Sequence, residues 1–352
     1  MGVVFGGRSA EHEVSVASAG NVLDAMDRAR YEPVLIGIDR EGRWLLDDAS
    51  RPLLDAAGKL PALEVALVRR GASNALVDLS EHRDLGTLDV VFPVLHGPYG
   101  EDGSVQGLCR LAGIPCVGAG VLGSAVGMDK DVMKRLLREA GIPTAGFLAV
   151  ARSQPAPSFE EAAAGLGVPL FVKPANLGSS VGVSKVRTAG EFAEALHLAF
   201  RYDTKAVVEE SIEGRELECS VLGNDDPVAS VPGEVLPSHE FYDYEAKYLD
   251  EHGAALEIPA RLEPAKTDEL RRLAVRAFRV LCCSGMARVD LFLRPGGELL
   301  VNEINTIPGF TRISMYPKLW EASGIPYRDL VDRLIRLAVE RHEEERGLQT
   351  SV

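Results

Sequence analysis

Cysteine is scarce in this sequence, and its spacing excludes two common kinds of site. The five cysteines are Cys109, Cys116, Cys219, Cys282 and Cys283, an odd number that contains no C-x-x-C pair. Neither a disulfide framework nor a zinc site built on paired cysteines is therefore indicated. We expect these side chains to behave as small buried hydrophobic groups.

Positive charge is also in short supply. Lysine and arginine together number 38 against 52 aspartates and glutamates, which gives a formal net charge of −14. Sequence-independent binding of DNA or RNA depends on Lys and Arg side chains that neutralise phosphates. The composition therefore argues against a nucleic-acid partner and favours a small molecule.

Long hydrophobic runs are missing as well. No stretch reaches the roughly 18 consecutive apolar residues of a membrane-spanning helix, and the first residues, Met1 to Gly7, have no basic region followed by an apolar core. We expect a cytoplasmic protein without membrane partners. With 352 residues, of which 46% are hydrophobic, the chain is long enough for two or three domains.

The N-terminal part alternates short apolar runs with helical patterns, which is typical of the α/β class. We expect strands at 2–5, 34–38, 89–95 and 114–117, and a helix from about 13 to 26. Ligands of such sheets bind at the carboxyl ends of the strands. The glycine-rich loops at 6–7 and 97–103 occupy such positions, so we expect them to line one pocket, with Glu11 on the first loop and His96 before the second.

Changes in composition divide the rest of the chain. We predict an N-terminal domain at 1–117, a central unit at 118–210 and a C-terminal unit at 211–345. In the central unit we expect strands at 170–173, 183–186 and 206–209 with a helix at 188–200, and in the last unit a helix at 265–281 and a hairpin. The charged end, 341–352, is expected to be a solvated tail.

A glycine-rich loop, Pro174 to Gly182, follows the strand that ends in Lys173. Backbone N–H groups and serine hydroxyls in such a loop suit a phosphate. The loop runs into a strand rather than a helix and lacks the G-x-x-x-x-G-K-[ST] pattern, so it is not a Walker loop. We predict a flap between two strands; the alternative is a plain hairpin turn with solvated serines.

Two acidic residues are expected to face each other in the C-terminal hairpin. The strands 288–293 and 298–305 flank Arg294-Pro295-Gly296-Gly297, and a two-residue turn at Gly296-Gly297 places Asp290 opposite Glu303. The period of two adds Arg288 and Asn305 to the same face. Oxygen ligands without Cys or His suit Mg²⁺. The alternative is a polar sheet face on which Arg288 neutralises Asp290.

Further polar residues lie near these motifs. The turn-rich segment 305–314 offers hydroxyl and N–H groups for a substrate carboxylate, or is a loop that serves only its Pro-Gly turn. Lys130 and Lys173 suit phosphate, and Glu209 and Glu216 suit adenine or ribose. Each of these four residues has an exposed surface position as its alternative.

Several segments taken together resemble the D-alanine-D-alanine ligases of the ATP-grasp superfamily. They are FGGRSAEHE at 5–13, LHG at 95–97 with GEDG at 100–103, GSSVG at 178–182, FYDYEAKY at 241–248 and NEINT at 302–306. The resemblance extends from about residue 2 to residue 338. It implies a three-domain ATP-grasp fold, α/β with α+β character in the part that clamps ATP, and an N-terminal Rossmann-like domain similar to that of biotin carboxylase.

The resemblance also implies a reaction and a set of roles. The carboxylate of one D-alanine would attack the γ-phosphate of ATP, and the amine of a second D-alanine would displace phosphate from the acyl phosphate. Catalytic roles fall to Glu11, Ser179, Tyr248, Arg288 and Ser314, and substrate binding to His96, Gly309 and Ser314. ATP would contact Lys130, Lys173, Ser179, Ser180, Glu209, Glu210, Ile212, Glu216, Lys247, Asn302 and Glu303. Asp290, Glu303 and Asn305 would hold two Mg²⁺ ions, with Mn²⁺ as a substitute, and the chain would form a homodimer.

Three other functions share some of these features. A ligase that takes D-lactate or D-serine as its second substrate differs within the family, and the intact YEAKY sequence that ends in Tyr248 argues for D-alanine. Another ATP-grasp carboxylase or ligase would lack the set Glu11, Tyr248 and Ser314. A non-catalytic nucleotide-binding protein would have lost Arg288 or the acidic residues of the hairpin.

Overall fold

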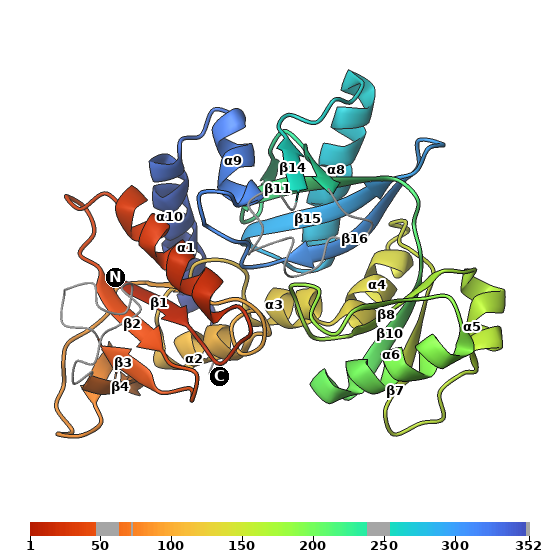
Figure 1. Cartoon of the computed structure of the whole chain (residues 1–352). Coiled ribbons are helices and arrows are strands. Elements are labelled where there is room, and N and C mark those ends of the chain that lie inside the picture. Colours follow the sequence, from red (N-terminus) through yellow and green to blue (C-terminus); the bar gives the residue numbers. More distant parts are fainter. Residues whose placement is uncertain (47–62, 72, 238–253, 350–352) are drawn as a thin grey trace.

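Three β-sheets follow one another along the chain and bring their loops together near the middle of the molecule (Figure 1). The structure is a computed structural model that describes residues 1–46, 63–71, 73–237 and 254–349. The predicted residues Lys247 and Tyr248 lie outside these ranges.

The first sheet has the strand order β5-β4-β3-β2-β1-β6. Its centre is parallel, because β1 pairs in parallel with both β2 and β6, while β3, β4 and β5 join as an antiparallel extension. The strands are β1 (Gly2–Gly6), β2 (Val34–Ile38), β3 (Trp44–Leu46), β4 (Leu63–Arg70), β5 (Ser73–Asp78) and β6 (Val91–Val94), with helices α1 (His12–Ala25) and α2 (Ser104–Ala112).

The α/β prediction for this sheet is confirmed at its parallel centre. The expected strand at 114–117 is wrong, since this segment forms only an isolated bridge from Cys116 to Val91. Pro115 has no N–H group, so its backbone can only accept a hydrogen bond, from Val91 N, before Val117 N returns one to Val91 O. The segment therefore lies beside β6 without extending the sheet.

The second sheet is antiparallel, in the order β7-β10-β8-β9. The strands are β7 (Phe147–Ala151), β8 (Leu170–Pro174), β9 (Ser184–Val186) and β10 (Lys205–Glu210); the helices are α3 (Val121–Met128), α4 (Lys130–Glu139), α5 (Phe159–Leu166) and α6 (Ala189–Tyr202). Capping boxes begin α5 at Ser158 and α6 at Thr188. The glycine-rich loop connects β8 to β9, which confirms the flap between two strands.

The third sheet has the order β14-β13-β11-β15-β16, with β12 beside β11. Its strands are β11 (Arg215–Gly223), β12 (Val228–Ala229), β13 (Gly233–Pro237), β14 (Ala254–Glu257), β15 (Gly285–Leu293) and β16 (Leu299–Asn305). Helices α8 (Pro264–Val280), α9 (Met315–Ala322) and α10 (Tyr327–Arg346) complete this part. The β15-β16 hairpin places Asp290 opposite Glu303, as the sequence predicts, although a register shift follows between Asp290 and Leu291.

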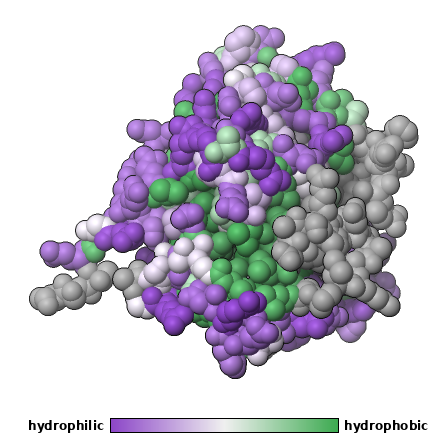
Figure 2. All heavy atoms as spheres, turned by 90° about the vertical axis from the view of Figure 1, so that its left-hand side faces the viewer, coloured by the Kyte–Doolittle hydropathy of each residue, from purple (hydrophilic) through white to green (hydrophobic). Residues whose placement is uncertain are grey.

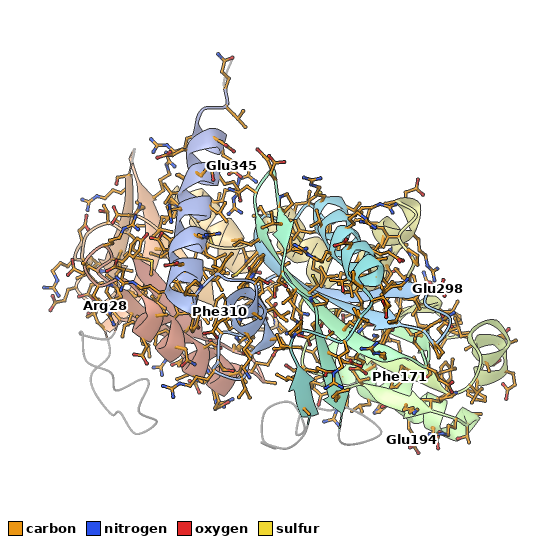
Figure 3. The ribbon with its side chains drawn as sticks, turned by 90° about the horizontal axis from the view of Figure 1, so that it is seen from above. Arg28, Phe171, Glu194, Glu298, Phe310 and Glu345 are labelled. Carbon is orange, nitrogen blue, oxygen red and sulfur yellow. The ribbon has the colours of Figure 1, made fainter. Side chains whose placement is uncertain are left out.

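A single hydrophobic cluster joins the two ends of the chain. It contains Phe5 and Phe92 from the first sheet together with Phe310, Tyr316 and residues of α10, and α10 lies beside α1 (Figure 1). Phe310 is buried between α10 and the third sheet (Figure 3), and its ring centroid lies 5.8 Å from that of Phe92. Apolar burial thus fixes the N-terminal sheet against the segment that follows the hairpin.

The expectation of a solvated tail from residue 341 is wrong at its start. Helix α10 continues to Arg346, and the Arg341 guanidinium donates to the backbone carbonyls of Gly118, at 2.6 Å, and Cys116, at 2.8 Å. The many charged residues of this segment suggested a solvated end. A partly buried guanidinium is nevertheless stable when it donates to several carbonyls at once, as Arg341 does. Arg341 therefore belongs to the folded body.

Burial of the cysteines is confirmed for Cys109, Cys116, Cys219 and Cys283, and all five are free thiols. Cys282 is exposed, because it adopts a positive φ of 54° just after α8 and its side chain turns away from the core. Among the described residues, no helix combines the length and the apolar character needed to cross a membrane.

Candidate active site

Glu11 lies where the first loop of the N-terminal sheet meets the glycine-rich loop of the second sheet. Glu11 is 7% exposed, and its Oε1 accepts a hydrogen bond from Ser179 Oγ. A Cβ atom at Gly97 or Gly178 would lie 3.1 Å from Glu11 Oε2, so both glycines allow the backbone to approach this carboxylate. The structure therefore brings Glu11 and Ser179 together, although 168 positions separate them.

His96 follows β6 and points toward the same region. Its Nδ1 lies 3.0 Å from the carbonyl oxygen of Ile307; since a carbonyl can only accept, Nδ1 carries the proton. Burial lowers the pKa of His96, so the neutral imidazole presents Nε2 as an acceptor. This Nε2 is buried and has no hydrogen-bond partner among the residues that the structure describes.

Glu101 received no role from the sequence, yet it joins two of the predicted loops. Its Oε2 accepts from Gly97 N at 2.8 Å and its Oε1 from Ile307 N at 3.2 Å. Burial raises the pKa of this carboxyl group to about 8, and the negative charge of Glu11 adds to the shift. The sequence did contain a signal for this role of Glu101: a carboxylate inside a glycine-rich loop can accept hydrogen bonds from the exposed N–H groups of that loop.

The two N-terminal loops line one cavity, as predicted, and His96 is among its lining residues, but Glu11 is not. This cavity of about 360 Å³ is lined by Gly6 and Gly7 from the first loop and by His96, Pro98 and Gly100 from the second, together with other side chains. A cavity of about 590 Å³ between β12 and α8 contains none of the predicted residues. Its arginines include Arg271 and Arg276, which donate to backbone carbonyls and so have structural partners.

Two lysines and an acidic residue form a buried charged cluster between the inner strands β8 and β10 of the second sheet and helix α4. Lys173 Nζ lies 2.6 Å from Glu209 Oε2, and Lys134 Nζ lies 3.1 Å from Glu209 Oε1. Burial alone would raise the pKa of Glu209, but the two ammonium groups bring it below its ordinary value. Because Lys173 is 9% and Glu209 4% exposed, the alternative of exposed surface charges is wrong for both.

Lys130 begins α4 and also faces inward, with 8% of the residue exposed. Its Nζ donates to Leu177 O in the glycine-rich loop at 2.8 Å and lies 3.4 Å from Glu303 Oε2. Lys130 therefore connects the glycine-rich loop with the acidic hairpin. The surface alternative is wrong here too.

The remaining described residues predicted for ATP lie on or next to β10, β11, β16 and the glycine-rich loop. Ser179 and Ser180 adopt positive φ angles of 52° and 58°, which non-glycine residues rarely do. The Glu210 carboxylate is committed elsewhere, to Gly146 N at 2.6 Å and to Arg294 at 3.1 Å. Ile212 lies in the loop between β10 and β11, Glu216 on β11 and Asn302 on β16.

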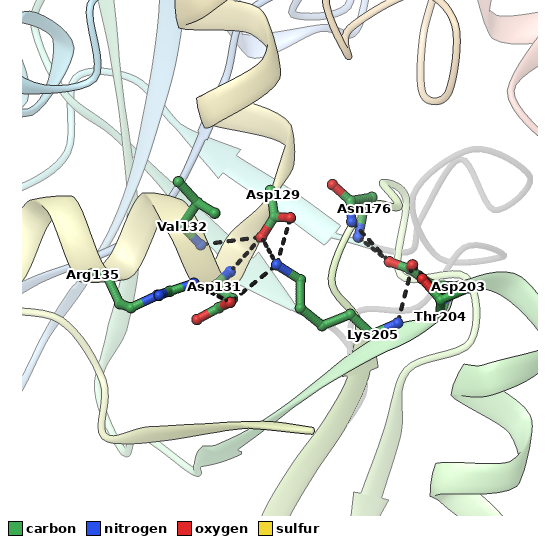
Figure 4. Close-up of polar contacts among 8 residues, drawn as sticks. All are labelled: Asp129, Asp131, Val132, Arg135, Asn176, Asp203, Thr204 and Lys205. Carbon is green, nitrogen blue, oxygen red and sulfur yellow. Dashed lines mark hydrogen bonds and ion pairs between the residues drawn. The ribbon is translucent and has the colours of Figure 1, made fainter. Parts of the chain in front are cut away.

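A charged network fixes the base of the glycine-rich loop (Figure 4). Lys205 Nζ lies 2.6 Å from Asp129 Oδ2 and 3.0 Å from Asp131 Oδ2, and Asp129 caps α4 through the N–H groups of residues 131 and 132. Asp203 accepts from both the backbone N and the Nδ2 of Asn176. These contacts fix the positions of helix α4, which begins with Lys130, and of the start of the glycine-rich loop, because both are bonded to residues at or just before the beginning of β10.

The acidic hairpin face carries all four residues that the sequence assigned to it. Arg288 donates to both oxygens of Asp290 at 2.7 Å and lies 2.9 Å from Glu218. Asn305 Nδ2 donates to Asp290 Oδ2 at 3.0 Å. In the described part of the chain no three His, Cys, Asp or Glu residues cluster as metal ligands. Arg288 thus neutralises Asp290, as the alternative for this face expects, while the two opposed carboxylates and the amide oxygen of Asn305 are of the ligand type that suits a hard cation.

Ser314 and Gly309 are held together in the loop before α9. Ser314 Oγ lies 2.7 Å from Thr311 Oγ1 and accepts from Thr311 N at 3.0 Å. A Cβ atom at Gly309 would lie only 2.7 Å from this Oγ. The backbone of Gly309 therefore passes directly against the hydroxyl of Ser314.

A glycine-rich flap between two strands, buried lysines beside it and a carboxylate pair on a facing hairpin define the ATP-grasp class of enzymes. Residues 1–119 match the family described as D-ala D-ala ligase N-terminus, and residues 136–336 match D-ala D-ala ligase C-terminus. The chain belongs to the D-alanine-D-alanine ligase family.

Known D-alanine-D-alanine ligases and related solved structures are similar to this chain over nearly its whole length. The D-alanine--D-alanine ligase A of Escherichia coli K12 is 52% identical over 359 residues, covering 100% of this chain and 99% of the relative. The D-alanine--D-alanine ligase of Oceanobacillus iheyensis is 50% identical, with coverages of 100% and 98%. The Coxiella burnetii ligase structure has a TM-score of 0.88 at 41% identity, covering 98% and 95%. The D-Ala:D-Ser ligase VanG of Enterococcus faecalis has a TM-score of 0.84 at 37% identity, covering 96% and 98%.

Proposed function

We propose that this enzyme uses ATP to join two D-alanine molecules into D-alanyl-D-alanine for peptidoglycan synthesis. A carboxylate oxygen of the first D-alanine attacks the γ-phosphorus, and ADP leaves. The amine of the second D-alanine then attacks the acyl carbon, phosphate leaves, and the amine loses a proton. The observation that carries this proposal is the contact between Glu11 and Ser179, because it sets a carboxylate suited to an amino-acid ammonium against the phosphate-type loop.

The first D-alanine is bound by charge and hydrogen-bond complementarity. Glu11 receives its ammonium group, and Ser179 orients the Glu11 carboxylate. His96 presents Nε2 as a further acceptor, which suits an N–H donor of the substrate. Tyr248 is expected to close this pocket.

Arg288 stabilises the negative charge that develops on the acyl oxygen when the second amine attacks. It is held by Asp290 and Glu218, so little reorganisation is needed when that charge appears. A preorganised donor of this kind contributes about 3 kcal/mol to the transition state. Ser314 binds the carboxylate of the second D-alanine, with Gly309 leaving room for its hydroxyl.

The nucleotide lies between the second and third sheets. Lys130, Lys173 and Lys247 bind its phosphates with the serines of the flap, and residues 209–216 frame the purine and ribose. Glu209 faces two lysines, so its side chain acts on the phosphate end more directly than on adenine. Asp290, Glu303 and Asn305 would hold two Mg²⁺ ions, which neutralise phosphate oxygens when bound.

We further propose that the enzyme is cytoplasmic, where ATP is available. Each chain would contain three domains, 1–117, 118–210 and 211–345, and two chains would form a homodimer. Hydrophobic side chains gather in the middle of the N-terminal face of the molecule (Figure 2), which supports a contact between two copies there. Sedimentation equilibrium of the purified chain measures this directly.

Phosphate release from ATP, with the product identified by mass, tests the reaction. We expect release with D-alanine and Mg²⁺ that yields D-alanyl-D-alanine, and no release with L-alanine. A mixed product with D-serine or D-lactate at comparable rate would move the enzyme to the group that takes another second substrate. No release with any D-amino acid would reject the proposal.

A further inference from the structure

Lys134 is a buried lysine that has no role in the proposed reaction. It lies on α4 one turn after Lys130, and its side chain has 0% exposure. Lysine is almost never buried to this extent unless its charge is paired. The partners of Lys134 therefore explain its presence in the core.

Both partners of Lys134 lie in the nucleotide site. Its Nζ is 3.1 Å from Glu209 Oε1, and it donates to the carbonyl oxygen of Asn302 on β16 at 3.2 Å. Glu209 is shared, since its other oxygen lies 2.6 Å from Lys173 Nζ. The carbonyl of Asn302 fixes the ammonium group of Lys134 from the side of the third sheet.

Counting charges shows what Lys134 adds to this cluster of three residues. Lys134, Lys173 and Glu209 together carry a net charge of about +1 when all three are ionised; Glu303, whose charge also acts on both lysines, is balanced by Lys130 at 3.4 Å. Without Lys134 the cluster would be neutral, because Lys173 would balance Glu209. Burial strengthens such an interaction, so Lys173 would then be held by Glu209 rather than by a phosphate.

We propose that Lys134 is a positioning residue of the nucleotide site, which shares Glu209 with Lys173 and so keeps the charge of Lys173 available to the phosphates of ATP. This inference rests on the proposed nucleotide site. It does not depend on which amino acids are joined.

Binding of a non-hydrolysable ATP analogue with Mg²⁺, measured by calorimetry, tests the proposal without any amino acid present. The variant Lys134→Met removes the charge and keeps much of the volume. We expect its affinity for the analogue to fall at least tenfold, the KM for ATP to rise by a similar factor, and the KM values for D-alanine to stay within twofold. Lys134→Arg should recover part of the affinity.

The control is Arg135→Met on the same helix. The Arg135 side chain is 64% exposed and contacts the outer side of the buried Asp131. Asp131 keeps its ion pair with Lys205 when Arg135 is replaced, so the variant loses the same charge and should bind the analogue as the wild type does. Urea unfolding of each variant shows how much stability is lost. A Lys134→Met enzyme that is less stable but binds the analogue within twofold of wild type would overturn the proposal.

A double variant covers the case in which Lys134→Met does not fold. Adding Glu209→Gln removes the buried carboxylate that would otherwise lack its second partner. We expect Lys134→Met/Glu209→Gln to fold and to bind the analogue as Glu209→Gln alone does. If the double variant binds the analogue tenfold more weakly than Glu209→Gln alone, Lys134 does not act through Glu209, and the proposal is overturned. Wild-type enzyme that binds the analogue but releases no phosphate with D-alanine would instead reject the proposed reaction.

Discussion

The contact between Gly309 and Ser314 allows a quantitative test of the second-substrate site. In the variant Gly309→Ala the new Cβ atom would lie 2.7 Å from Ser314 Oγ and 3.5 Å from Ser314 Cβ. The hydroxyl must therefore move. Its present position is fixed by Thr311 N at 3.0 Å and Thr311 Oγ1 at 2.7 Å, and these contacts are lost when it rotates away.

Losing these two intraprotein bonds lowers the stability of the loop by about 1 kcal/mol each but does not by itself change binding. The displaced hydroxyl also loses its proposed hydrogen bond to the carboxylate of the second D-alanine, and a bond to a charged group contributes about 2 kcal/mol, or roughly 30-fold in binding, because about 1.4 kcal/mol corresponds to a factor of ten. We expect the KM for the second D-alanine to rise by this factor in Gly309→Ala. The KM for ATP should stay within about twofold, since no hydrogen bond of the nucleotide site changes.

Gly296→Ala is the matched control. A Cβ atom there would meet nothing within 4 Å, and neither glycine has a positive φ, so both variants carry the same substitution without backbone strain. The assay is ADP release at saturating ATP, with D-alanine varied over a range that separates its two binding steps. Wild-type KM values in both variants would refute the reasoning. A uniform loss of activity with a lowered Tm would assign Gly309 to folding of the loop.

The contacts of the site support three further predictions. Ser179→Ala removes the hydrogen bond that orients the Glu11 carboxylate, so the proposed contact of Glu11 with the substrate ammonium weakens; such a charged contact contributes about 1.5 kcal/mol, and the KM for the first D-alanine should rise about tenfold. An unchanged KM in steady-state assays would contradict this. Glu101 has a folded-state pKa of about 8, above its ordinary value, so the folded state retains a proton that the unfolded chain releases. The free energy of unfolding should therefore fall between about pH 5 and 8, by at most about 1.4 kcal/mol per pH unit, and urea midpoints of Glu101→Gln should lack this slope; equal slopes in both proteins would exclude it. Asp290→Asn should raise the Mg²⁺ concentration for half-maximal activity on the order of tenfold, whereas an unchanged Mg²⁺ dependence would mean that Asp290 serves only to hold Arg288.

The hairpin shows how far the sequence determines the site. The expected pairing of Asp290 with Glu303 is confirmed, but the expected two-residue turn is wrong. Arg294 N bonds to Glu298 O and Gly297 N to Arg294 O, so three residues, 295–297, form the turn and shift the pairing by one. The register shift after Asp290, which skips Asn302, restores the predicted pair.

The burial pattern of β16 contains the sign of this bulge. Leu299, Leu300 and Val301 are all buried, but only Leu299 and Val301 belong to the hydrophobic cluster that also contains Ile304. Alternation would place residue 303 in that cluster next. Instead Ile304 is 4% exposed, three positions after Val301, while residues 302 and 303 are polar. Two consecutive polar residues between buried apolar ones therefore marked a break in the period of two.

Other parts of the site depend on contacts that no local pattern encodes. His96 bonds to Ile307 across 211 positions and Arg341 to Gly118 across 223. The residue types suggested binding or surface roles, but partners at such separations are set by the packing of whole sheets and helices. For this reason the residue types gathered at the site were predictable, whereas the long-range hydrogen bonds of His96 and Arg341 were not.

Helix α4 shows that a violated pattern can itself be informative. Its buried positions include 130, 133, 134 and 137, the i, i+3, i+4, i+7 spacing of a core-facing stripe. Met133 and Leu137 suit that stripe, but Lys130 and Lys134 do not. Burying two ammonium groups is unfavourable unless anions lie beneath them, and Glu209 and Glu303 do lie there. Lysines at the apolar positions of a helix thus indicate, by their spacing in the sequence, that the helix packs onto an acidic or phosphate-binding site rather than onto a plain hydrophobic core.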